Sequence, residues 1–128
     1  MSDPDPSAAV RAAFLDVYDA ALTGVARAYD EVPSNRSWPA LILRAVQVIP
    51  DDGDCLNGSE IYLDFDAWSK VLDHSETVAI AGIVRRTPFA IQGHVVIIQE
   101  LVSVQFTGDP DPNIARAALS LRLETEPA

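Results

Sequence analysis

Two stretches of strict two-residue alternation constrain the fold of this chain more than any other feature. In residues 60–68, the apolar positions Ile61, Leu63, Phe65 and Ala67 alternate with polar or amphipathic ones. Residues 115–124 repeat the pattern, with alanines and leucines at the odd positions and Arg, Ser and Glu at most of the even ones. A period of two predicts β-strands with one buried face and one solvated face.

Three further segments have the composition of strands. Residues 41–49 carry Leu, Ile and Val at both parities, which predicts an interior strand covered on both faces. Residues 95–106 predict a long strand, and residues 25–32 a short strand or extended connection. Segments rich in Pro, Gly, Asp and Asn separate these runs at residues 34–39, 50–54 and 108–113, where we expect loops.

Two segments have helical periodicity. After Ser7, a candidate N-cap, apolar residues share one helical face up to Thr23-Gly24, which predicts the helix end. That face is formed by Val10, Phe14, Val17, Tyr18, Ala21 and Leu22. A second helix is expected from a capping box of Asp73 and Glu76 to Arg86, before Thr87-Pro88.

The order of these elements predicts an α+β fold, in which a mostly antiparallel sheet is covered on one side by two α-helices. A length of 128 residues suits a single domain covering residues 1–128. Residues 1–6 and 125–128 contain Pro and acidic side chains, so we expect flexible tails there.

Charge and composition exclude several classes of partner. The chain has 19 acidic and 9 basic side chains, a net charge of −10, and no cluster of Lys and Arg, so we do not expect it to wrap DNA. No apolar run is long enough to span a membrane. Cys55 is the single cysteine, which rules out an intrachain disulfide, and residues 1–7 lack the pattern of a signal peptide, so we expect a reducing compartment.

Residues able to carry chemistry are few. Cys55 has acidic neighbours, which disfavour a reactive thiolate, and we interpret His74 as an exposed helix-start residue and His94 as a turn residue. An acidic loop resembles a calcium loop in composition but lacks the required register; it contains Asp51, Asp52, Asp54 and Asn57. We therefore expect no catalytic residues, no cofactor and no metal.

Two features of the alternating strand at residues 60–68 allow functional interpretations. Its polar face carries an acidic row of Glu60, Asp64 and Asp66, which is most simply a solvated sheet face. Trp68 at its end, together with Trp38, is either a core residue or an anchor in a protein interface.

Several segments, taken in order, resemble the tail completion proteins of long-tailed bacteriophages, also called tail terminator or head-to-tail joining proteins. The resemblance covers residues 8–126. It rests on a short opening helix, Ala28-Tyr-Asp-Glu-Val-Pro33, Trp38-Pro-Ala-Leu-Ile-Leu43, Ile61-Tyr-Leu-Asp-Phe-Asp-Ala-Trp-Ser69, Glu76-Thr-Val-Ala-Ile-Ala-Gly-Ile-Val84 and Ala118-Leu-Ser-Leu-Arg-Leu-Glu-Thr-Glu126.

The resemblance implies a non-enzymatic virion protein of a bacteriophage or gene transfer agent. Such a subunit forms a hexameric ring in the tail-neck region, between the tail tube protein and the head-neck connector or stopper protein, and is assembled in the host cytoplasm. DNA passes through the ring without specific binding. In such a ring Glu60, Asp64 and Asp66 are candidates for an acidic lumen, and the loops at residues 50–58 and 107–113 are candidates for ring closure.

The alternative is a small α+β ligand-binding or hydrolytic domain. In that case the sheet and helices would enclose a pocket with Asp64, Asp66 or His94 near its mouth. Paired carboxylates on one strand face have a spacing that permits acid–base chemistry.

Overall fold

The computed structural model describes residues 7–31, 38–51, 58–108 and 112–127. Two helices and five strands follow one another along the chain. They are α1 (Ser7–Ala21), β1 (Arg27–Tyr29), β2 (Ala40–Asp51), β3 (Gly58–Ser69), α2 (Ser75–Arg86), β4 (His94–Gly108) and β5 (Ala115–Pro127). Neither helix is long and apolar enough to cross a membrane.

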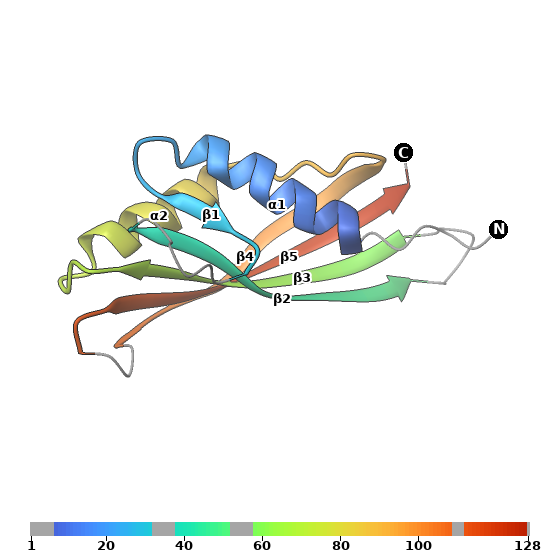
Figure 1. Ribbon diagram of the computed structural model, residues 1–128. Coiled ribbons are helices and arrows are strands. Elements are labelled where there is room, and N and C mark those ends of the chain that lie inside the picture. The colour runs from blue at the N-terminus through green and yellow to red at the C-terminus, as the bar shows by residue number, and fades with distance from the viewer. Residues whose placement is uncertain (1–6, 32–37, 52–57, 109–111, 128) are drawn as a thin grey trace.

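The strands form one sheet in the order β1-β2-β3-β5-β4. All neighbouring pairs are antiparallel except β1 and β2, which run parallel. Both helices lie on the same side of this sheet, above it in Figure 1. The predicted α+β class, with a mostly antiparallel sheet and helices on one side, is therefore confirmed.

The two alternating segments form the centre of the sheet, as β3 and β5. Leu63 pairs with Leu121, and Phe65 with Leu119, so the apolar rows of the two strands lie side by side. Against them α1 packs Phe14 and Tyr18, whose rings lie 5.5 Å and 5.8 Å from the ring of Phe65. The hydrophobic core therefore occupies the single layer between the sheet and the helices.

Local signals determine where α1 ends. The helix stops at Ala21, the Thr23 hydroxyl donates to the carbonyl of Ala20 at 2.8 Å, and Gly24 adopts a left-handed φ of 81°. A glycine is suited to this conformation because it has no Cβ to clash with the backbone. The predicted helix stop is confirmed.

The start of α2 differs from the predicted capping box. The Asp73 carboxylate accepts a hydrogen bond from the backbone N–H of Ser75, at 2.9 Å, which holds the pKa of Asp73 below its ordinary value. Glu76 instead accepts from the Ser69 hydroxyl at 2.6 Å, so it ties α2 to the end of β3. His74 is the N-cap, and it is half-buried rather than exposed because its ring lies edge-on to Phe106, at 5.6 Å.

Two further expectations need correction. Strand β2 is buried on both faces only over residues 40–43; from Arg44 onward its side chains are half-buried or exposed, because β1 pairs only with its first three residues. Residues 125–127, expected to be part of a flexible tail, continue β5, where Thr125 is 3% exposed and pairs with Ser59 and Val96. Residues 1–6 and 128 lie outside the described part of the chain.

Tyr18 has an unusual environment within the core. Its side chain is fully buried among aromatic rings, and no described residue forms a hydrogen bond with its hydroxyl. This burial raises the pKa of Tyr18 above its ordinary value, because the phenolate would have to exist without water.

We expect Tyr18→Phe to increase the free energy of unfolding by about 1 kcal/mol, because the change removes a buried, unpaired hydroxyl. The gain should grow above pH 10, since the unfolded wild-type chain can ionise this phenol and the folded chain cannot. Thermal or urea unfolding measures both effects. A loss of stability would mean that the hydroxyl has a partner, whereas the matched change Phe65→Ala should cost about 3–5 kcal/mol.

Candidate functional site

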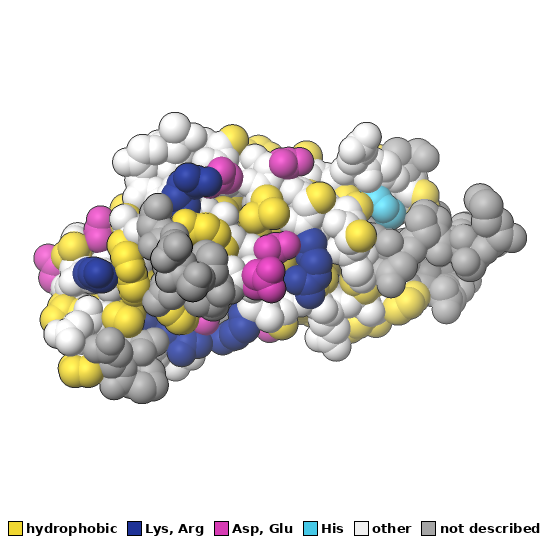
Figure 2. Space-filling view, viewed as in Figure 1, with side chains coloured by type: hydrophobic (Ala, Val, Ile, Leu, Met, Phe, Trp, Pro, Cys, Tyr) yellow, Lys and Arg dark blue, Asp and Glu magenta, His cyan; other side chains and the backbone are white. Residues whose placement is uncertain are grey.

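The side of the sheet away from the helices is not covered by any described element (Figure 1). We call it the open face. Across it, side chains of β3 stand beside those of β5, with Glu60 opposite Glu124, Tyr62 opposite Arg122, Asp64 opposite Ser120, and Trp68 opposite Arg116. In Figure 2 the open face is seen edge-on along the lower margin of the molecule, where parts of basic and acidic side chains are visible. The polar alternation of the sequence therefore forms a single charged surface.

Asp66 is the most enclosed charge of the open face. Its side chain is only 7% exposed. One carboxylate oxygen accepts a hydrogen bond from Arg116 Nη2 at 2.9 Å, and the other lies 3.4 Å from Arg44 Nη1. Arg44 is positioned by a β-bulge that leaves it between Leu43 and Ala45 in the register with β3. The expectation that Asp66 belongs to a solvated acidic row is therefore wrong, because two guanidinium groups cover it.

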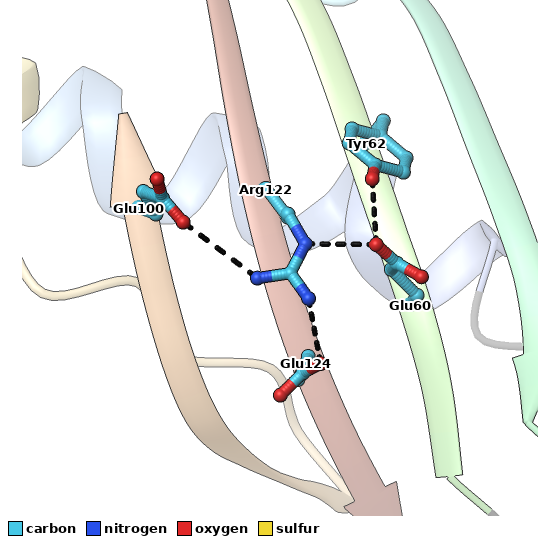
Figure 3. Close-up of polar contacts among 5 residues, drawn as sticks. All are labelled: Glu60, Tyr62, Glu100, Arg122 and Glu124. Atoms are coloured by element: carbon cyan, nitrogen blue, oxygen red, sulfur yellow. Dashed lines mark hydrogen bonds and ion pairs between the residues drawn. The ribbon is translucent and has the colours of Figure 1, made fainter. Parts of the chain in front are cut away.

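A second group of charges surrounds Arg122 at the other end of the open face (Figure 3). Arg122 donates from Nε to Glu60 at 2.8 Å and from Nη2 to Glu124 at 2.6 Å, while Nη1 lies 3.7 Å from Glu100. Glu60 and Glu124 face each other across the strands, an arrangement that repels unless a cation bridges it. Arg122 is that bridge.

Glu60 is additionally held by Tyr62, whose hydroxyl donates to the same carboxylate oxygen at 2.6 Å. The hydrogen bonds from Tyr62 and Arg122 hold the pKa of Glu60 below its ordinary value. Since the folded-state pKa is the lower one, this contact stabilises the fold at neutral pH and is lost as the pH falls through that pKa.

Asp64 lies between these two groups, opposite Ser120 on β5 and Ala45 on β2. It is half-buried and forms no ion pair with any described residue. The acidic row predicted from sequence therefore contains three different environments. Asp66 is covered, Glu60 is bound in a network, and Asp64 has no cationic partner among the described residues.

The two tryptophans are brought together at one end of the sheet. Their ring centroids are 6.3 Å apart, and Lys70 Nζ lies 5.0 Å from the centroid of Trp38. Both side chains are half-buried. This arrangement fits a surface-lining aromatic pair with a cation on it.

The structure does not assemble the candidate catalytic pocket. Asp64 pairs with Ser120, while His94 pairs with Pro127, seven positions further along β5, which corresponds to about 23 Å. Within residues 7–31, 38–51, 58–108 and 112–127, no group of His, Cys, Asp and Glu side chains could hold a metal ion. Cys55 and the acidic loop residues Asp52, Asp54 and Asn57 lie outside the described residues, as do most of residues 50–58 and part of residues 107–113.

Sequence reasoning missed the arginines that organise the open face. Arg116 and Arg122 occupy outward positions of β5, six residues apart, so their exposure was predictable. The partners of these arginines could not be predicted, because each ion pair depends on the register between strands far apart in sequence. Arg44 could not be identified because its position results from the bulge.

These observations define a small α+β domain with a one-sided core and an ion-paired sheet face. The chain belongs to the family of tail completion protein gp17, whose model matches residues 8–126. The protein is thus a structural component of a phage-type tail.

The fold is shared with a solved virion structure. A chain from the virion of a native gene transfer agent particle superposes with a TM-score of 0.72 and 12% sequence identity, over 97% of this chain and 99% of that chain. At this identity the likeness shows a common fold. No curated protein sequence matches the chain.

We expect Asp66→Ala to lower the free energy of unfolding by about 2 kcal/mol, because it removes a charged hydrogen bond and leaves Arg116 without its carboxylate. Asp64→Ala is the matched control, two positions away on the same strand face, and should change stability by less than about 0.5 kcal/mol. Urea unfolding of both variants measures the difference. Equal effects would contradict the assignment of Asp66 as the anchor of this end of the open face.

Proposed function

We propose that this protein forms a hexameric ring in the tail-neck region of the virion, between the tail tube protein and the head-neck connector or stopper protein. The observation that carries the proposal is the family match, which spans almost the entire chain and not one motif. The common fold with a chain of a gene transfer agent virion supports it. In this role the ring terminates the tail, joins it to the head after assembly in the host cytoplasm, and catalyses no reaction.

We further propose that the open face lines the lumen of the ring. Carboxylates outnumber guanidinium groups there, and each of Arg44, Arg116 and Arg122 is already engaged by a carboxylate of the same chain. Arginines held in this way are poorly available to DNA phosphates. The excess negative charge of the open face repels those phosphates. Asp64 and Glu60 supply negative charge to this lumen. Asp66 is enclosed, and its role is to hold Arg44 and Arg116 in place.

The aromatic pair of Trp38 and Trp68 is the proposed anchor for a neighbouring protein of the neck. Half-buried tryptophans at the end of a sheet offer a large apolar area with little side-chain entropy to lose. Because Trp68 stands on the open face at the end of β3, this anchor supports binding to the tail tube protein or the connector at the mouth of the lumen.

Interrupting the gene in the producing strain tests the joining role. We expect electron microscopy to show filled heads separate from tails, or tails of uncontrolled length, because the tube lacks its terminal ring. Restoring the gene should restore joined particles. Normal joined particles from the interrupted strain would contradict the proposal.

Charge reversal at Asp64 tests the lumen. Asp64→Lys places an unpaired cation on the open face, so we expect joined particles that deliver less DNA, because phosphates are retained in the channel. Asp16→Lys is the matched control: it makes the same change in net charge on exposed α1, on the opposite side of the sheet. Equal DNA delivery by the two variants, at equal numbers of joined particles, would exclude the open face from the lumen.

A further inference from the structure

Two edges of the sheet have no strand beside them in the described chain. Strand β4 is the last strand of the sheet, so its outer side is unpaired along its whole length. At the other edge, β1 pairs only with residues 40–42 of β2, which leaves residues 43–51 unpaired on that side. Unpaired backbone N–H and C=O groups of this kind can pair with another chain.

Strand β4 lacks two of the features by which proteins protect such edges. It contains no Lys and no Pro. It does have two bulges, but the residues left out of register are Ile97 and Val102, both about half exposed. Val95, Ile98 and Phe106 are further exposed apolar side chains of the same strand. An edge that exposes aliphatic side chains to this extent is suited to burial in an interface.

We infer that β4 of one copy pairs in antiparallel orientation with residues 43–51 of β2 in a neighbouring copy, so that the sheet continues from subunit to subunit around the ring. The inference rests on the proposed ring and specifies its interface. The occupant of each free edge is therefore a second copy of this chain.

The directions of the strands support this arrangement. From β2 through β3 and β5 to β4, each neighbour is antiparallel, so β4 runs opposite to β2. A rotation axis along the strands keeps the direction of every copy, and therefore brings β2 of the next copy antiparallel to β4. Such a heterologous contact, repeated by a rotation of one sixth of a turn, closes into the proposed hexameric ring.

One register brings complementary side chains together at both of its ends. With Val95 opposite Ile49, both on the open face, Val96 meets Val48 on the helix side. Continuing past the Ile97 bulge places Glu100 opposite Ala45 and beside Arg44. Glu100 is the only acidic residue of β4, and Arg44 the only basic residue of β2. In this register the first two pairs are apolar and Glu100 comes beside Arg44, while Ile98 lies opposite Gln47 and Gln99 opposite Val46. The pairing ends where β1 of the neighbour begins.

Paired cysteines test this register in assembled particles. The variant carries Val95→Cys and Ile49→Cys with Cys55→Ser, so that the introduced thiols are the only ones. Oxidation of purified joined particles should produce a ladder of disulfide-linked multimers of this chain. The largest multimer should contain as many copies as the ring. A control pair of Ile49→Cys with Val78→Cys, on α2, should leave monomers.

Each other result contradicts either the edge pairing or the proposed function. Joined particles without multimers would overturn the edge pairing and leave the ring intact. Covalent dimers from Val95→Cys alone would instead indicate two β4 strands meeting around a two-fold axis. Particles that lack this chain would overturn the proposed function itself.

A second pair of variants tests the edge pairing independently, in case the cysteine variant does not assemble into particles. Val95 and Val78 are similarly exposed, at 46% and 53%. Val95→Asp should abolish head–tail joining and Val78→Asp should retain it, while both purified chains melt at the wild-type temperature. Equal joining by the two variants would overturn the inference.

Discussion

The fold depends on hydrophobic burial that is concentrated on the helix side of the sheet. The apolar rows of β3 and β5 are covered by α1 and α2, and no described element covers the opposite face. Charged side chains on that face are therefore stabilised by ion pairs with one another. Arg122 bridges Glu60 and Glu124, and Arg44 and Arg116 enclose Asp66, so the strands are joined by ion pairs where they lack an apolar cover.

The same constraint connects the fold to its role in a tail. A sheet with helices on one side presents four surfaces to neighbours: a helix side, a charged face and two strand edges. An ion-paired, net acidic face suits a channel for DNA, since its cations are already occupied. Unpaired edges with exposed aliphatic residues suit contacts between subunits. Each surface thus has a chemistry suited to one direction of the assembly.

Much of the architecture could be predicted because alternation and helical periodicity report one-sided burial directly. The helix formed by residues 7–21 and strand β5 are examples, since each has a single uninterrupted apolar face. Properties that depend on partners distant in sequence could not be predicted. Asp66 looks like any other polar residue of β3 until the register places Arg116 and the bulged Arg44 beside it. For the same reason, the composition of β2 did not reveal that β1 covers only its first three residues.

We propose that the open face is turned toward the DNA channel of a ring. The most direct test is a cryo-electron microscopy reconstruction of the neck of joined particles, at a resolution that separates strands from helices. We predict six copies of this chain around the tail axis, with the open face toward the channel and α1 and α2 outward. A ring with the helices facing the channel, or a neck without this chain, would contradict the account.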